Sequence, residues 1–274
     1  MDGVVFGGRE RRRAEKRREE KSRLGDPTYL GATSLGLAML LLFDIDGTLL
    51  VTQGSGMRAM GEAGHELFGA RFDETKVKFA GRLDPLIIAD LLRHNNLPLS
   101  RENMAAMLEG YRRHLVPKLA TPGNGRALPG VQELLASLRA RTDITLGVLT
   151  GNIEETGRLK LKACGIDPDQ FVLSVWGDHS PHDPPARSHL PAVGIARYRT
   201  MFGREIDPAR VSIIGDTPYD AECALANGCR CLGVATGQFS VAQLLESGAH
   251  HAVADLTATA EIVSWLVDDA RSSK

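Results

Sequence analysis

The sequence has few cysteines, no long apolar run and almost no net charge. Its four cysteines form no CxxC pair of the zinc-binding kind, and Cys229 and Cys231 are interpreted as small buried strand residues rather than as a redox or metal pair. The longest apolar stretch, Leu35 to Phe43, is about half as long as a membrane-spanning helix. The formal charge of −1 gives no reason to expect nucleic acid or a membrane surface as partner. These absences predict a cytoplasmic protein.

Residues 1–36 contain a dense mixture of Arg, Lys and Glu between Arg9 and Arg23. Acidic residues interrupt the basic ones, and the small-residue cleavage site of a signal peptide is missing. The composition predicts a disordered, charged extension. The alternative, an arm that binds nucleic acid, is weakened because the glutamates dilute the basic charge.

From Met39 onward, mostly apolar runs of strand length alternate with segments of helical pattern. The runs are Leu40–Phe43, Ile144–Leu149, Phe171–Trp176, Val211–Ile214 and Cys231–Val234. The helical segments are Val131–Ala140, Glu154–Ala163, Pro191–Met201, Asp220–Ala226, Val241–Ser247 and about Thr257–Asp269. Runs without polar alternation suit strands that are buried on both faces. The pattern therefore predicts an α/β fold with a doubly wound, Rossmann-like parallel sheet.

A long insert separates the first two expected strands, which lie about a hundred residues apart, far more than one crossover requires. Most of the insert has a helical pattern, at Met57–Leu67, Pro85–His94 and Arg101–Leu119. Asp84 and Pro85 are interpreted as an N-cap and the first helical residue. We expect a helical cap at 53–126 and a core built from 37–52 and 127–274. The cap would lie at the carboxyl end of the first strand, where open α/β sheets bind ligands.

The first strand ends directly in Asp44-Ile45-Asp46-Gly47-Thr48. Side chains two residues apart share one face of a strand, so both carboxylates can point the same way. Carboxylates bind Mg²⁺ well, and one can attack phosphorus while its neighbour carries the proton. An isolated pair of this kind is a weak signal, but a pair at the end of an apolar strand is a stronger one.

Two other strands end in comparable residues, Thr150-Gly151-Asn152 after Leu149 and the pair Asp216 and Asp220 after Ile214. With the first motif, these segments occur in the order typical of the haloacid dehalogenase superfamily, which the sequence resembles from about Met39 to Leu256. The insert after the first motif resembles the cap of phosphoglycolate-phosphatase-like members. The resemblance implies a phosphoric monoester hydrolase that acts on a small phosphorylated metabolite, as a monomer or homodimer.

The same resemblance implies roles for the acidic residues. Asp44 would be the nucleophile and a ligand of Mg²⁺. Asp46 would bind the ion through its backbone carbonyl and act as the general acid and base. Asp216 would be a further metal ligand, and Asp220 would support it.

Phosphate recognition is implied for the second motif and for one residue of the cap. Thr150, Gly151 and Asn152 would hold phosphate oxygens at a helix start. Arg82 would contact a substrate anion, unless it only forms a salt bridge with Asp84.

The third motif departs from the family, because Gly177–Leu190 contains no lysine. Arg187 and Lys160 are the two candidates for the missing cation. Lys160 follows Asn152 by eight residues, which is about 12 Å along a helix and longer than its side chain. We therefore expect Arg187 to supply the charge, with Lys160 as the second candidate.

Three alternatives remain open. A phosphomutase would share the first chemical steps and would convert a sugar phosphate without releasing phosphate. A non-catalytic binding protein on this fold would have no need to keep several carboxylates close together. A nucleic-acid-associated protein that uses the charged extension would bind with a steep salt dependence.

Overall fold

The computed structural model describes residues 38–268, which lie in one compact unit. The charged extension expected at 1–36 falls outside these residues. Within the described part of the chain, no helix combines the length and the apolar character needed to cross a membrane.

The core is a six-stranded sheet in the order β5-β4-β1-β6-β7-β8, and every neighbouring pair is parallel. Its strands are β1 (Met39–Phe43), β4 (Ile144–Leu149), β5 (Leu173–Val175), β6 (Val211–Gly215), β7 (Arg230–Val234) and β8 (His251–Val253). The predicted doubly wound α/β fold is therefore confirmed. The edge strand β8 was not predicted, because it is three residues long and its side chains are only half-buried.

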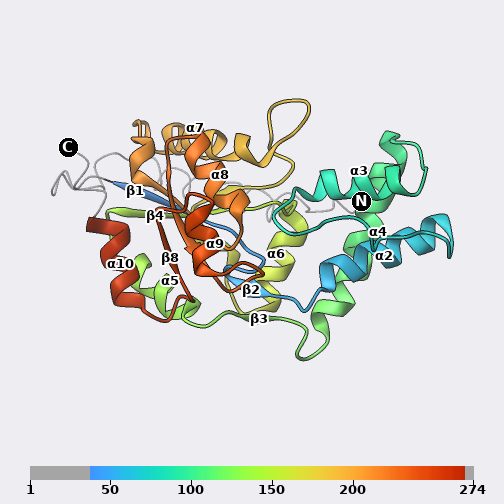
Figure 1. The fold of residues 1–274 in the computed structure, drawn as a ribbon, viewed down its shortest axis with the longest axis horizontal. Coiled ribbons are helices and arrows are strands. Elements are labelled where there is room, and N and C mark those ends of the chain that lie inside the picture. The colour runs from blue at the N-terminus through green and yellow to red at the C-terminus, as the bar shows by residue number, and fades with distance from the viewer. Residues whose placement is uncertain (1–37, 269–274) are drawn as a thin grey trace, which may run out of the picture. The chain divides into compact units, whose positions relative to one another are not determined.

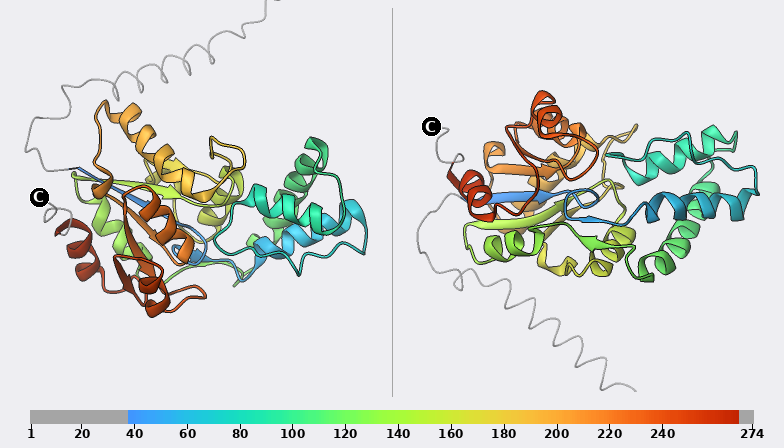
Figure 2. Two further views of the ribbon diagram at one scale, coloured as in Figure 1. Left: turned by 45° about the horizontal axis from the view of Figure 1, so that its top comes forward. Right: turned by 60° about the horizontal axis from the view of Figure 1, so that its bottom comes forward.

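Helices cover both faces of this sheet (Figure 2). They are α5 (Val131–Arg139), α6 (Glu154–Ala163), α7 (Leu190–Phe202), α8 (Pro218–Ala226), α9 (Val241–Glu246) and α10 (Thr259–Asp268). Alternate side chains of the central strand point to opposite faces. Leu41 and Phe43 pack with α5 and α10, whereas Leu40 and Leu42 pack with α7, α8 and α9. This burial on both faces explains why β1 is entirely apolar.

The long insert forms a three-helix bundle with an apolar cluster of its own (Figure 1). It consists of α2 (Ser55–Phe68), α3 (Asp84–His94) and α4 (Arg101–Ala120). The Ser100 hydroxyl caps α4 by accepting a hydrogen bond from the Asn103 backbone N–H at 3.1 Å. Two short antiparallel strands, β2 (Leu50–Val51) and β3 (Arg126–Ala127), connect the insert to the core. This ribbon of two residues per strand was too short to predict from periodicity.

Two local expectations were wrong. Asp84 is the first residue of α3 and not its N-cap, which is Leu83; the Asp84 carboxylate bonds to a different helix, as described below. The strand expected at Phe171–Trp176 covers only Leu173–Val175, because a 3₁₀ turn at Pro168–Gln170 precedes it. The Phe171 backbone N–H closes that turn on the Pro168 carbonyl.

Candidate active site

Three buried aspartates meet at the carboxyl ends of two neighbouring strands. Asp44 follows β1 and Asp216 follows β6, and the two strands pair in parallel with Phe43 opposite Ile214. Asp220 comes from the first turn of α8. Each residue offers a carboxylate oxygen, and these oxygens all lie within 4.8 Å of one another. The chain topology thus brings together three of the four acidic residues expected near a metal.

The Asp220 carboxylate is already fully engaged. It accepts hydrogen bonds from the Thr217 backbone N–H at 3.0 Å and from the Thr217 hydroxyl at 2.7 Å. It also accepts one from Nη2 of Arg187 at 2.5 Å. Asp220 is therefore placed to orient its neighbours rather than to offer free oxygens.

Asp216 has a different environment, because the backbone of two glycines closely approaches its carboxylate. The Thr48 hydroxyl donates a hydrogen bond to Oδ1 of Asp216 at 3.5 Å. A Cβ added at Gly47 would lie 2.3 Å from Oδ2 of Asp216, and one at Gly237 would lie 1.8 Å from it. Only glycine allows the two backbone segments to approach this closely.

Burial raises the pKa of two of these carboxyl groups. The pKa of Asp44 rises to about 6 through burial, against the lowering effect of Arg187. The pKa of Asp216 rises to about 8, through burial and the nearby Asp220 and Asp44 carboxylates. Clustered carboxyl groups ionise reluctantly because their negative charges repel one another. A small, hard divalent cation stabilises their ionised form and prefers oxygen ligands of this kind. Asp44 and Asp216 therefore fit such a cation.

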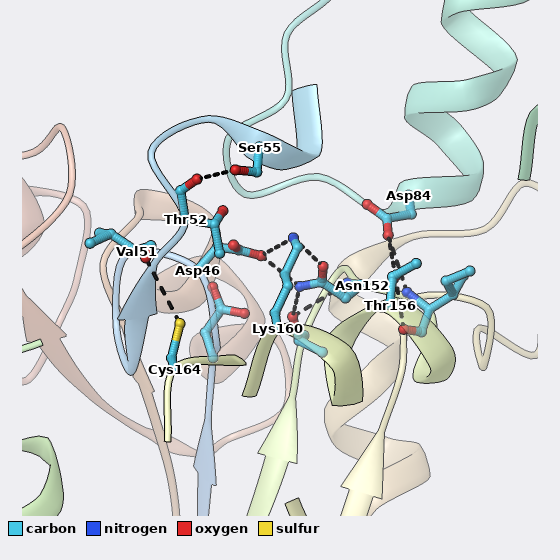
Figure 3. Close-up of polar contacts among 12 residues, drawn as sticks. Asp46, Val51, Thr52, Ser55, Asp84, Asn152, Thr156, Lys160 and Cys164 are labelled. Carbon is cyan, nitrogen blue, oxygen red and sulfur yellow. Dashed lines mark hydrogen bonds and ion pairs between the residues drawn. The ribbon is translucent and has the colours of Figure 1, made fainter. Parts of the chain in front are cut away.

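Asp46 points to the other side of the site, toward α6. Its Oδ2 accepts hydrogen bonds from Nδ2 of Asn152 at 2.8 Å and from Nζ of Lys160 at 2.7 Å. Lys160 also donates to Oδ1 of Asn152 at 2.6 Å, so the three side chains form a closed group (Figure 3). The Asn152 amide also donates to the Thr150 hydroxyl at 2.8 Å, which connects the group to the second motif.

The expectation that Lys160 lies too far away was wrong. Thr156 and Lys160 lie four residues apart on one side of α6, and Asn152 lies just before the helix begins. The helix passes beside Asp46 instead of leading away from it. Burial of Lys160 lowers its pKa, but the nearby Asp46, Tyr111 and Asp84 side chains raise the pKa by more than burial lowers it. The net shift of the pKa is upward. The lysine is therefore held in its charged form.

Arg187 also lies within the site, in the short 3₁₀ turn (Arg187–His189) before α7. Its Nη2 is 3.2 Å from Oδ2 of Asp44, in addition to its contact with Asp220. Burial lowers the pKa of Arg187, and the two carboxylates more than reverse this effect. Its buried Nε has no hydrogen-bond partner among the residues that the structure describes. Both candidate cations are thus present, and each contacts a different carboxylate of the first motif.

A cavity of about 610 Å³ opens over these residues, between the core and the insert. Its core side includes Asp44, Asp46, Thr150, Gly151, Asn152, Lys160, Arg187 and Asp216. Its insert side includes apolar side chains from α2, α3 and the segment between them, namely Met57, Met60, Phe79 and Ile87. The cavity combines a charged floor with an apolar wall.

A family model described as haloacid dehalogenase-like hydrolase matches residues 41–225, a span that includes Asp44, Thr150, Arg187 and Asp216. The chain belongs to this family. It is 28% identical over 207 residues to the "Probable phosphatase IndB" of Dickeya dadantii (strain 3937), covering 75% of this chain and 84% of that protein. The predicted enzyme class, a hydrolase of phosphoric monoesters, agrees with these matches.

Solved structures share the fold of this haloacid dehalogenase-like hydrolase. A "predicted phosphoglycolate phosphatase" from Haemophilus somnus 129pt has a TM-score of 0.62 and 20% identity, covering 84% of this chain and all (100%) of that one. CbbY from Rhodobacter sphaeroides, in complex with phosphate, has a TM-score of 0.60 and 20% identity, covering 81% and 96% of the two chains. Both likenesses concern the fold, and they span core and insert together.

The insert of this hydrolase contacts the second motif directly. The Asp84 backbone N–H donates to the Gly151 carbonyl at 2.7 Å. The Asp84 carboxylate accepts hydrogen bonds from the Ile153 backbone N–H at 3.3 Å and from the Thr156 hydroxyl at 3.5 Å. The Asp84 carboxylate therefore bonds to the amino-terminal end of α6 and not to that of its own helix, α3. Burial raises the pKa of Asp84 to about 6.

Sequence reasoning missed Asp84, Thr156 and Tyr111 as part of the site. The four-residue spacing of Thr156 and Lys160 was the available signal for a shared side of α6. Arg82 forms an ion pair with Asp90 at 2.6 Å, so the alternative of a salt bridge with Asp84 was wrong. Arg82 lines the cavity, and its contact with a substrate anion stays a prediction.

Proposed function

We propose that this protein hydrolyses a small phosphate monoester through a phosphorylated Asp44 and requires Mg²⁺. The observation that carries the proposal is the group of Asp44, Asp216 and Asp220 beside Asp46, at one end of the sheet. Membership of a hydrolase family and the likeness to a protein named as a probable phosphatase support it.

The carboxylates of Asp44 and Asp216, together with the backbone carbonyl of Asp46, would hold the Mg²⁺. When bound, the ion supplies positive charge that orients the phosphoryl group and offsets its anionic oxygens. Asp220 would keep Arg187 beside Asp44 through the contact at 2.5 Å.

Asp44 attacks phosphorus with a carboxylate oxygen, and the bond from phosphorus to the leaving alcohol oxygen breaks. Asp46 gives a proton to that oxygen, then removes a proton from the water that attacks the phosphorylated Asp44. The second attack releases inorganic phosphate and regenerates the Asp44 carboxylate.

The remaining polar residues would stabilise charge on the transferred phosphoryl group. The Thr150 hydroxyl and the Asn152 amide lie at the end of β4, 2.8 Å from each other. Lys160 and Arg187 add two cations on either side of Asp44 and Asp46. The helical insert, expected at 53–126, would act as the cap that separates the reaction from water.

The decisive experiment measures phosphate release from a panel of phosphorylated metabolites, with Mg²⁺ and with excess EDTA. We expect EDTA and Asp44→Asn each to abolish release, because an amide cannot form the acyl phosphate. Asp46→Asn should slow release by about 10²–10⁴-fold. Asp178→Asn is the matched control, since Asp178 is exposed and does not line the cavity.

Full activity of Asp44→Asn would rule out the mechanism. Conversion of a sugar phosphate without phosphate release would identify a phosphomutase. Tight binding of phosphorylated compounds without turnover would identify a binding protein.

A further inference from the structure

The cavity is larger than the phosphate group that the proposed chemistry acts on. Its volume of about 610 Å³ falls in the range of about 300–1,000 Å³ that holds small organic ligands. Asp44, Thr150 and Arg187 line one part of it, and apolar side chains such as Met57 and Phe79 line another. The second region therefore offers space for the part of a substrate that departs as the alcohol.

Four cationic side chains line the cavity, and three of them already have carboxylate partners. Arg82 pairs with Asp90 at 2.6 Å, Lys160 with Asp46 at 2.7 Å, and Arg187 with both Asp44 and Asp220. The fourth is Arg126, an exposed side chain that has no ion pair or hydrogen bond within residues 38–268. Of these four cationic side chains, Arg126 is the one that forms no ion pair with a carboxylate of the described residues.

Arg126 has a defined position relative to the reacting residues. It lies on β3 and pairs with Val51 of β2, and the residue before Val51, Leu50, forms a bridge with Asp46. A Cβ added at the preceding Gly125 would lie 3.0 Å from Sγ of Cys164, at the end of α6. The backbone around Arg126 is thus fixed against the core, while its guanidinium group remains free.

We propose that Arg126 binds a second anionic group of the substrate, either a carboxylate or a second phosphate, remote from the phosphoryl group that is transferred. The inference rests on the proposed phosphatase function and assigns its substrate class. A guanidinium group grips either anion with two parallel hydrogen bonds. The apolar side chains of Met57, Met60 and Phe79, which line the same cavity, would contact the carbon skeleton of the substrate.

The test uses two pairs of compounds that differ in the second anion. O-phosphoserine and O-phosphoethanolamine differ by a carboxylate, and fructose bisphosphate and fructose monophosphate differ by a phosphate. Each compound is assayed for turnover and as a competitive inhibitor of para-nitrophenyl phosphate hydrolysis, so every compound gives a measurable constant. The preference is the ratio of the two constants within a pair.

We expect the wild type to prefer the member with the second anion in at least one pair, and the responding pair separates carboxylate from phosphate. Arg126→Gln should reduce that preference by roughly 10- to 100-fold, the share of one charged hydrogen-bonding contact. Arg126→Lys should retain part of it. Arg139→Gln, a change at an exposed arginine outside the cavity, should retain all of it.

An equal preference in wild type and Arg126→Gln, or no preference in either pair, would overturn the inference while leaving phosphate release from para-nitrophenyl phosphate in place. Absence of any phosphate release would instead mean that the proposed function fails. The two failures are therefore distinguishable in a single set of assays.

Discussion

The Nζ of Lys160 lies 2.7 Å from Oδ2 of Asp46, across the junction between α6 and the first motif. Asn152 contacts both groups, so the side chain expected to carry the proton is fixed by one cation and one amide. Such a pair restricts the rotamers of Asp46, whose side chain is otherwise 40% exposed. To carry a proton, Asp46 has to give up its contact with Lys160. A phosphate group that attracts Lys160 to its own oxygens would release Asp46 from this contact.

Removing the Lys160 charge should therefore impair catalysis more than folding. We expect Lys160→Met to lower kcat by roughly a hundredfold, because one preorganised electrostatic contact and the anchor of Asp46 are lost together. Lys162→Met is the matched control, two residues further on and exposed on the same helix. A kcat for Lys160→Met equal to that of the control would show that Lys160 only packs beside the site.

Arg187 should matter for stability as well as turnover. Arg187→Ala leaves the buried Asp44 and Asp220 carboxylates without their cation, and removing one partner of a buried pair costs about 3–5 kcal/mol. We expect the free energy of unfolding in urea, measured with EDTA present, to fall by about that amount, and kcat to fall by two orders of magnitude or more. Arg187→Lys should recover most of the stability. A variant with unchanged stability would mean that the carboxylates find other partners.

Much of the fold could be predicted because the signals were local. The run Leu40–Phe43 is apolar throughout since both faces of β1 are covered, and this pattern predicts a central parallel strand. The convergence of Asp44 and Asp216 follows in turn, because neighbouring parallel strands end at the same edge of the sheet.

The contacts of Lys160 and Asp84 could not be predicted in the same way. Sequence separation measures distance along a helix, and Lys160 reaches Asp46 across the side of α6. Asp84 has the sequence context of an N-cap, yet its carboxylate bonds to the start of another helix, 69 residues away. Both contacts depend on how the insert and α6 pack laterally, which local patterns do not encode.

The close approach of the insert to the second motif gives a steric prediction. A Cβ at Gly151 would lie 2.0 Å from the Arg82 carbonyl oxygen, so Gly151→Ala has to displace the Arg82–Asp84 segment. We expect the variant to lose the hydrogen bond from the Asp84 backbone N–H, and turnover to fall at least tenfold because the cavity no longer closes. Hydrogen exchange should increase at the start of α3 while β1 and β6 remain protected.

Gly194→Ala is the control for this substitution. It adds a methyl group inside α7 at 3.3 Å from the flexible end of Leu42, and alanine favours a helix interior. Comparable losses of turnover in Gly151→Ala and Gly194→Ala would show that the close approach at Gly151 does not matter for catalysis.

The last prediction links pH, stability and Mg²⁺. In the metal-free protein, burial holds the pKa of Asp44 at about 6 and that of Asp216 at about 8, above the unfolded value of about 3.9. A raised carboxyl pKa stabilises the fold fully below the unfolded value, and this contribution is lost as pH rises through the folded value. With EDTA, the Tm should therefore fall between about pH 4 and pH 8, from the unfolded pKa to the folded pKa of Asp216, whereas excess Mg²⁺ should reduce or reverse the fall. Because Mg²⁺ displaces the Asp216 proton below about pH 8, the apparent affinity for Mg²⁺ should rise by up to about tenfold per pH unit in that range.

Asp216→Asn should flatten both the Tm profile above about pH 7 and the pH dependence of Mg²⁺ binding, measured by calorimetry. Mg²⁺ affinity that does not vary with pH in the wild type would show that Asp216 binds no metal.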